Sequence, residues 1–319
     1  MSALSPPGRD VLAVTVGVGG VRARRTGTTD AADSFVEVPD ASVDPGGPAD
    51  AAALVAAVAG LTARGGHPPE AVSWAVHPGW RGGPAADLLA AVRAVGADRA
   101  VVVDEGYAAH VGAFGGVLPG ICLSLGATAS ALVTDLGDRW HLLDGWPVPL
   151  GGRGSGAWIG AQGLAAALRH RDGVPDGSGR LLAAARAEFG DEQGWPALLA
   201  EQGDVVLTRF APVVCEVAVE DALARAVVTA AGECLADLVV SARAILPDGP
   251  VVAVGGLLYL DGVRVALASA LGRRRLFVMP ALGGALEGAR LVGEHLLAGG
   301  VLAHRPPYVV LGEQGRLPS

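Results

Sequence analysis

The sequence predicts an α/β fold of two domains, on grounds of length, composition and a repeated order of elements. The chain has 319 residues, and a single hydrophobic core usually stops growing at roughly 250–300 residues. Hydrophobic residues make up 51% of the chain and charged residues 18%, which is enough apolar material for two cores and argues against disorder. Short strand-like apolar runs alternate with helical stretches in two successive sets.

The first set of elements begins with residues 11–18, which are almost all apolar and predict a buried strand. Gly19-Gly20 predicts the turn into a second strand over 21–25. Asp50 is a typical N-cap for a helix over 51–63, and Pro84 is a typical first residue of a helix that ends near residue 95. The other predicted elements are strands over 34–38, 72–76 and 100–103 and a short helix over 106–114.

The second set repeats this order with an insertion. Strands are predicted over 120–124, 129–134, 139–143, 251–254 and 276–279, and helices over 263–271 and 283–298. A helical insertion is expected from about residue 155 to 245. Two such units predict a two-domain actin-like (ribonuclease H-like) architecture, with domains at 1–114 and 115–319 and ligands in the cleft between them. The tail after Ala303 is expected to form either an ordered edge or a loose end.

The charge pattern argues against a nucleic-acid partner. The formal net charge is −8, the pI is about 5.3, and the 24 basic residues are all arginine. Nucleic-acid binding needs a basic face, and the short arginine groups at 22–25 and 273–275 are typical of solvated edges.

The cysteine pattern and the first residues indicate a cytoplasmic protein. Cys122, Cys215 and Cys234 have no spacing typical of a disulfide framework or a zinc site, so no metal centre is predicted. Residues 1–10 lack the basic and apolar regions of a signal peptide. No uncharged apolar run approaches the roughly 20 residues that a membrane helix needs, so no membrane partner is expected.

The middle of the chain carries a recognisable motif. Gly145-Trp146 leads through residues 147–150 into Gly151-Gly152-Arg153-Gly154-Ser155, which is followed by Trp158-Ile159-Gly160. Without a gap, this stretch resembles the segment GGWG…LLGDEGSxxWIG of N-acetylglucosamine kinases and BadF/BadG-type ATPases.

Weaker matches follow in the same order along almost the whole chain. Residues 126–130 (GATAS) lie where that family has SGTGS, and residues 102–109 resemble its element NDAxAA at the end of a strand. Gly255-Gly256 resembles the family's adenosine-side glycine turn, and residues 281–285 resemble the start of its last helix. The turn at residues 17–23 corresponds to the family's opening DGGGTKT.

The resemblance implies ATP and Mg²⁺ as cofactors, a small sugar-like ligand and a possible homodimer. Asp104, at the end of a predicted strand, is expected to be the catalytic base and to contact the substrate; Glu105 is an alternative acid. The residues implied for nucleotide or phosphate are Gly17, Gly19, Gly20, Arg22, Ala127, Thr128, Ser130, Gly255 and Gly256. Those implied for the substrate are Asp44, Gly145, Trp146, Gly152 and Arg153.

Several family carboxylates are missing from these positions. Gly17 stands where the family has the aspartate of its opening motif, and Gly152 and Arg153 replace both acids of GDEGS. Magnesium prefers hard oxygen ligands, often one or two carboxylates, and loss of one catalytic group can cost several powers of ten in rate. Asp10 lies at the other end of its strand, roughly 20 Å away at ~3.3 Å per residue, and cannot substitute.

These departures leave alternative functions. The preferred interpretation is a kinase-like protein that binds nucleotide and a sugar-like ligand but transfers phosphate weakly or not at all. The alternative is an active kinase of an amino sugar that uses Asp104 as base. An activator ATPase for a radical dehydratase would need cluster-binding cysteines, and the three cysteines form no suitable motif. A sugar-responsive repressor would need a helix-turn-helix, and the residues before the first predicted strand are expected to be too few for one.

Overall fold

A computed structural model describes residues 9–17, 20–27, 34–38, 58, 67–76, 89 and 96–311. The chain divides into two compact units, which are described separately: Met1–Leu118 with Ala281–Ser319, and Pro119–Pro280. The helices predicted over 51–63 and 84–95 fall outside the described residues except for Val58 and Leu89, which are helical and buried.

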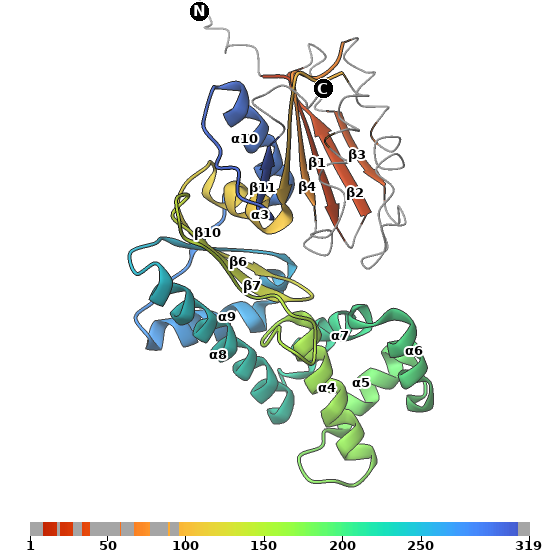
Figure 1. The fold of residues 1–319 in the computed structure, drawn as a ribbon. Coiled ribbons are helices and arrows are strands. Elements are labelled where there is room, and N and C mark those ends of the chain that lie inside the picture. Colours follow the sequence, from red (N-terminus) through yellow and green to blue (C-terminus); the bar gives the residue numbers. More distant parts are fainter. Residues whose placement is uncertain are drawn as a thin grey trace, which may run out of the picture. The chain divides into compact units, whose positions relative to one another are not determined.

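The first unit contains a mixed sheet in the order β11-β5-β4-β1-β2-β3 (Figure 1). Its strands are β1 (Val11–Gly17), β2 (Gly20–Arg25), β3 (Ser34–Val38), β4 (Ala71–Val76), β5 (Arg99–Asp104) and β11 (Val309–Leu311). β1, β4 and β5 run parallel, whereas β2, β3 and β11 pair antiparallel with their neighbours. Both β1 and β4 are almost wholly buried, which explains their continuous apolar sequences. The strand β11 shows that residues 309–311 of the tail form an ordered edge strand.

Two helices of the first unit pack closely on each other: α3 (Glu105–Phe114) and α10 (Ala285–Leu297). Their backbones meet at glycines, because a Cβ on Gly288 would lie 1.7 Å from the Ala108 carbonyl oxygen and one on Gly112 would lie 2.1 Å from the Gly284 oxygen. The helix α10 also packs on β1 and β4. The C-terminal segment therefore helps to build the first unit.

This division differs from the expected one. The sequence interpretation placed all of 115–319 in the second domain, but Ala281–Ser319 groups with the first unit. The physical reason is that the apolar face of α10 is buried on α3 and on the sheet of the first unit, with Ala289 and Val292 fully inaccessible to solvent.

The second unit contains a five-stranded sheet in the order β10-β9-β6-β7-β8. Its strands are β6 (Gly120–Leu125), β7 (Ala129–Thr134), β8 (Trp140–Asp144), β9 (Val251–Val254) and β10 (Met279–Pro280). β6, β7 and β8 form an antiparallel meander, and β9 runs parallel to β6 and β10. The helix α9 (Asp261–Arg273) follows β9 after the short 3-10 helix η3 (Gly256–Tyr259).

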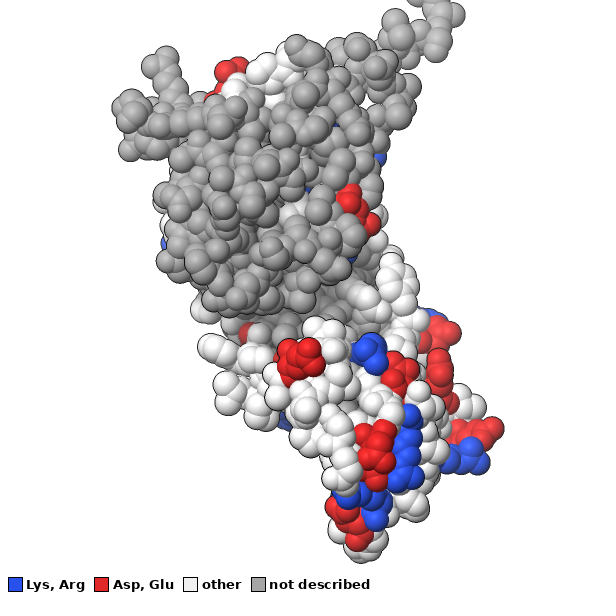
Figure 2. All heavy atoms as spheres, turned by 90° about the vertical axis from the view of Figure 1, so that its right-hand side faces the viewer, with Lys and Arg blue, Asp and Glu red and all other residues white. Residues whose placement is uncertain are grey.

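The expected helical insertion contains α4 (Gly156–Arg171), α5 (Gly179–Phe189), α6 (Trp195–Gln202), α7 (Asp204–Val217) and α8 (Ala222–Ile245). Ion pairs hold this insertion together: Arg180 of α5 pairs with Glu220 of the turn after α7 at 2.5 Å, and Arg209 of α7 pairs with Glu188 of α5 at 2.8 Å. Acidic and basic side chains are intermixed on the lower part of the face that Figure 2 shows. Within the described residues, no helix combines the length and the apolar character needed to cross a membrane.

Candidate functional site

Three parallel strands of the first unit end at one edge of its sheet. The register pairs Val16 of β1 with Val76 of β4, and Val76 with Asp104 of β5. Neighbouring strands lie about 4.8 Å apart, so the ends of β1 and β5 are separated by roughly 10 Å. Gly17 and Asp104, which the sequence assigned to one site, therefore lie at the same edge.

The last residue of β1 and the first residue of β2 also lie at this edge. Gly17 pairs with Gly20, whose φ of +102° is unfavourable for residues with side chains. Arg22 stands opposite Thr15 and forms an ion pair with Glu37 at 3.1 Å. Gly19 and Asp44, also predicted as site residues, lie outside the described residues.

The missing carboxylate at Gly17 is not replaced by Asp10. Asp10 precedes β1 at the opposite end of the strand, and its two oxygens accept from Arg25 at 2.8 and 2.6 Å. Both side chains are buried. Asp10 thus forms a buried ion pair at the far end of β1 and cannot replace the carboxylate that is missing at Gly17.

Asp104 acts as the N-cap of α3. Its backbone is extended, its Oδ1 accepts the Gly106 N–H at 2.9 Å, and the residue is only 3% exposed. An aspartate at this position satisfies one of the unpaired N–H groups of the first helical turn. The predicted base therefore also has a structural role.

Glu105 follows directly as the first residue of α3 and is half-buried. Burial, and then the negative charge of Asp104, raise the pKa of Glu105 to about 7, while Arg22 opposes this shift. A signal for this residue was present in the sequence. Matched letter by letter, the element NDAxAA aligns its asparagine with Asp104 and its aspartate with Glu105.

His110, the histidine of α3, is not a candidate for proton transfer. His110 is fully buried, and its Nε2 lies 2.7 Å from the Leu118 carbonyl oxygen. Burial lowers the pKa of His110 to about 4, so the ring is neutral at pH 7. It packs against Phe114 with ring centroids 4.6 Å apart.

The second unit has its own edge, formed by the β6–β7 hairpin. Gly126 donates to the Thr128 carbonyl at 2.9 Å and closes the turn. Ala127 is exposed, while Thr128 and Ser130 are half-buried. The predicted phosphate-loop residues are thus brought together at an accessible hairpin tip.

The N-terminus of α4 is joined to this hairpin. The N–H groups of Gly156 and Ala157 donate to the carbonyls of Gly126 and Ala127 at 2.9 and 3.2 Å. The Ser155 hydroxyl caps the helix by accepting from the Trp158 N–H. Since these donors are already used, α4 holds the hairpin in place and is not itself an anion site of the kind that free helix N-termini provide.

The glycine turn after β9 lies beside the hairpin. Ser124 pairs with Val254, which places Gly255 next to Leu125. A Cβ on Gly255, whose φ is +118°, would lie 2.0 Å from the Leu125 carbonyl oxygen. Gly256, by contrast, has open space around its Cβ position. Both predicted adenosine-side glycines are exposed, so their backbone is accessible to a ligand.

The Gly145–Gly152 loop meets the same edge and is organised by a residue that the sequence reasoning missed. Asp144 ends β8 with a φ of +56°, and its Oδ1 accepts from the N–H groups of Trp146 at 3.3 Å and Gly152 at 2.8 Å. Gly145 donates to the Ala129 carbonyl, which ties the loop to the hairpin. Trp146 is 64% exposed and is therefore available as a ligand wall.

This arrangement predicts the behaviour of Asp144 variants. Asp144→Ala removes the acceptor of two loop N–H groups and is expected to lower the free energy of unfolding by about 1–3 kcal/mol. Asp144→Asn keeps an acceptor oxygen and tolerates positive φ, so its loss should stay below about 1 kcal/mol. Chemical unfolding of both variants tests this, and equal loss in the two would contradict the capping role.

Gly152 and Arg153 stand where the related motif has two acids. Gly152 has a φ of +62°, and a Cβ there would lie 2.9 Å from the Trp146 carbonyl oxygen, so this backbone disfavours any side chain at 152. Arg153 is exposed and lies near Cys234 of α8, where it opposes the rise in thiol pKa caused by burial. A cation thus replaces the acid at this edge.

The groups at the edge of the second unit suit a nucleotide better than a bare metal ion. The exposed hairpin and the glycine turn fit a phosphate or nucleotide, because backbone can approach the ligand closely there. A metal site built from protein ligands alone does not fit. Among the described residues, no three His, Cys, Asp or Glu side chains gather where they could hold a metal ion.

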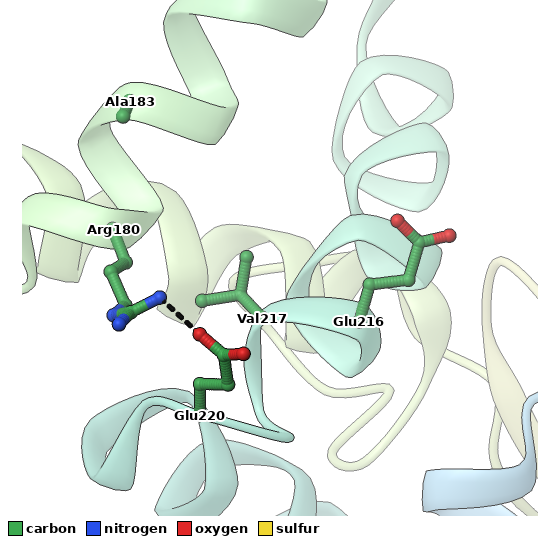
Figure 3. Close-up of a pocket in the computed structure, with 5 residues that line it drawn as sticks. All are labelled: Arg180, Ala183, Glu216, Val217 and Glu220. Carbon is green, nitrogen blue, oxygen red and sulfur yellow. Dashed lines mark hydrogen bonds and ion pairs between the residues drawn. The ribbon is translucent and has the colours of Figure 1, made fainter.

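A hollow of about 410 Å³ opens elsewhere in the second unit, lined by Arg180, Ala183, Glu216, Val217 and Glu220. Figure 3 shows Arg180 and Glu220 joined by an ion pair beside Val217. It lies on α5 and the end of α7 and contains none of the predicted site residues.

Neither a protein-family model nor a curated protein matches the sequence significantly, but solved structures do. A presumed N-acetylglucosamine kinase from Chromobacterium violaceum is 26% identical with a TM-score of 0.71, over 90% of this chain and 99% of that chain. One from Porphyromonas gingivalis is 19% identical with a TM-score of 0.66, over 88% and 97%. A ROK family glucokinase from Streptomyces griseus, solved with glucose and AMPPNP, is 19% identical with a TM-score of 0.52, over 90% and 99%.

These similarities confirm the predicted fold class, a two-domain actin-like α/β fold, and the predicted resemblance to N-acetylglucosamine kinases. The chain therefore shares its fold with these solved structures.

Proposed function

We propose that this protein binds ATP and a small sugar-like molecule, and that it transfers phosphate slowly to a hydroxyl of that molecule. The observation that carries the proposal is the gathering of predicted residues at sheet edges. Gly17, Gly20 and Asp104 share one edge in the first unit, and the hairpin, the glycine turn and the Gly145–Gly152 loop share one in the second.

Each edge has a part in the proposal. The hairpin at 126–130 and the turn at Gly255-Gly256 would hold the nucleotide phosphates and adenosine, with Gly17, Gly19, Gly20 and Arg22 supplying further phosphate contacts. The substrate would lie near Asp44, Asp104, Gly145, Trp146, Gly152 and Arg153. The Asp104–Glu105 pair supplies the carboxylates of the site.

The metal is proposed to arrive with the nucleotide. When bound to ATP, Mg²⁺ would neutralise phosphate charge during transfer. The chain offers no carboxylate at Gly17 and no three-ligand cluster in its described part. This shortage of acids is the reason that slow transfer is proposed.

A second candidate function is ligand binding without transfer. It is favoured by Gly152 and Arg153, which replace both acids of the related motif with a glycine whose backbone disfavours a side chain and with an exposed cation. In either case, we propose that the protein is cytoplasmic, and the resemblance implies a homodimer.

Calorimetry and a transfer assay test the proposal together. We expect Mg-ATP to bind, Mg²⁺ alone to give no measurable heat, and radiolabelled phosphate to appear on at least one amino sugar of a panel. Binding without transfer would favour the second candidate, and absence of nucleotide binding would contradict both. Magnesium binding in the absence of nucleotide would contradict the proposed route of the metal.

A further inference from the structure

The segments that form the edge of the second unit carry one positive charge. Among residues 126–130, 144–153 and 255–256, the cationic side chain is that of Arg153 and the carboxylate is that of Asp144. The Oδ1 of Asp144 accepts from the N–H groups of Trp146 and Gly152. The carboxylate is thus directed into its own loop, whereas Arg153 is exposed.

The backbone on both sides of Arg153 is fixed by the fold. Gly152 and Gly154 have φ values of +62° and +86°, which side chains disfavour. A Cβ at Gly154 would lie 2.7 Å from the carbonyl oxygen of Ala231, so the loop rests directly on the backbone of α8. The cation is therefore held in place beside α8 before any ligand binds.

The positive charge of Arg153 is not matched by an acid of the protein. Within the described part of the chain, Arg153 forms no ion pair with a carboxylate, and its side chain hydrogen-bonds to Cys234 of α8. Burial raises the pKa of this thiol, so it is neutral at pH 7 and a weak acceptor. Two acids of the same helix, Glu233 and Asp237, both pair with Arg274 at 2.7 Å. An anionic ligand would therefore be a better partner for Arg153 than the thiol is.

An aromatic surface lies on the same loop. The side chain of Trp146 is 64% exposed. A Cβ at Gly151 would lie 2.8 Å from the Trp146 Cβ and 3.3 Å from its Cδ1, so the tryptophan lies against the segment that leads to Arg153. An indole ring offers a large apolar face, which suits the C–H face of a sugar ring, and a guanidinium binds a carboxylate through two parallel hydrogen bonds.

We propose that the substrate is a sugar that carries a carboxylate group, with Arg153 binding the carboxylate and Trp146 covering the ring. This inference rests on the proposed function and names the substrate class of the same site. One cation suits a group with a single negative charge, whereas a phosphate monoester carries between one and two negative charges at pH 7.

Calorimetry on the full chain tests the substrate class with matched sugars. The probes are glucose, galactose and N-acetylglucosamine, each beside the uronate that has a carboxylate at carbon 6, and beside the corresponding 6-phosphate. Hydrogen bonds to charged groups are strong enough that at least one uronate should bind at least about ten-fold more tightly than its neutral parent. The 6-phosphate of that sugar should bind more weakly than the uronate.

Variants of Arg153 test whether this residue causes the preference. Arg153→Gln is expected to weaken uronate binding by at least about ten-fold and to remove the preference over the neutral parent. Arg153→Lys keeps the charge but lacks the planar fork, so its preference should fall between those of the wild type and Arg153→Gln. Arg225→Gln, which removes an exposed arginine of the same helix α8, is the matched control and should keep the wild-type preference. Urea unfolding of Arg153→Gln should match that of the wild type.

The outcomes separate this inference from the function on which it rests. Neutral sugars that bind as tightly as their uronates would overturn the inference and leave the proposed function intact. Tighter binding of a 6-phosphate than of its uronate would replace the carboxylate by a phosphate. Weaker binding of Mg-ATP by Arg153→Gln, with an unchanged uronate preference, would assign the cation to the nucleotide instead. A protein that binds Mg-ATP and none of the sugars would overturn the sugar-like ligand of the proposed function, and this inference with it.

Discussion

A Gly288→Ala substitution is expected to lower the free energy of unfolding of the first unit by about 3 kcal/mol or more, since overpacking of a tight contact typically costs 1–3 kcal/mol and sometimes more. The new Cβ would lie 1.7 Å from the carbonyl oxygen of Ala108 and 2.7 Å from the backbone nitrogen of Gly112. Both contacts are backbone atoms of α3, so no side-chain rotation relieves them. The helices would have to separate and expose the apolar face of α10.

Gly284→Ala provides the matched control for this experiment. Gly284 lies one turn earlier on the same segment, and a Cβ there has no atom within 4 Å. Its loss of stability should therefore stay near 1 kcal/mol or less, the usual size of a change at a helix N-cap. Urea unfolding followed by circular dichroism measures both variants. Equal stability of the two proteins would contradict the close helix contact.

The second large effect is expected at Gly255. Gly255→Ala forces a side chain into a φ of +118° and places its Cβ 2.0 Å from the Leu125 carbonyl oxygen. Backbone strain of this kind costs about 1–3 kcal/mol and overpacking a further 1–3 kcal/mol. We therefore expect a loss of about 2–6 kcal/mol in the stability of the second unit, with weaker binding of Mg-ATP in any protein that still folds.

The neighbouring Gly256→Ala separates strain from ligand contact. A Cβ at Gly256 meets no protein atom within 4 Å, so its stability should stay within about 1 kcal/mol of the wild type. If the turn contacts adenosine as proposed, Gly256→Ala should still weaken nucleotide binding in calorimetry. Unchanged affinity in this stable variant would place the nucleotide away from the turn.

Much of the fold could be predicted from sequence because local patterns determine it. The apolar run at 11–16 and the repeated order of strands and helices indicate two sheets, and both sheets are present. The placement of α10 could not be predicted in this way. Helical periodicity shows which face of a helix is apolar but not which surface covers it, and here the covering surface is α3, about 180 residues earlier in the chain.

The candidate site shows the same division between local and long-range information. Strand ends at a common edge could be predicted, because parallel strands bring their carboxyl ends together. The roles of Asp104 and Asp144 could not, since each depends on which backbone N–H groups its oxygens meet after folding. Glu105 could have been ranked higher from the letter-by-letter match, but its half-buried setting beside Arg22 emerges only with the sheet in place.

The first unit is built from two separate segments of the chain, residues 1–118 and 281–319, and this affects how it folds during synthesis on the ribosome. The second unit is continuous in sequence from Pro119 to Pro280, so all of its strands and helices emerge together and can fold as one body. The first unit must wait for α10 and β11, which are translated after the second unit and join its sheet and its helix layer. Until then β5 has an unpaired edge, and the nascent first unit would be a natural client for chaperones.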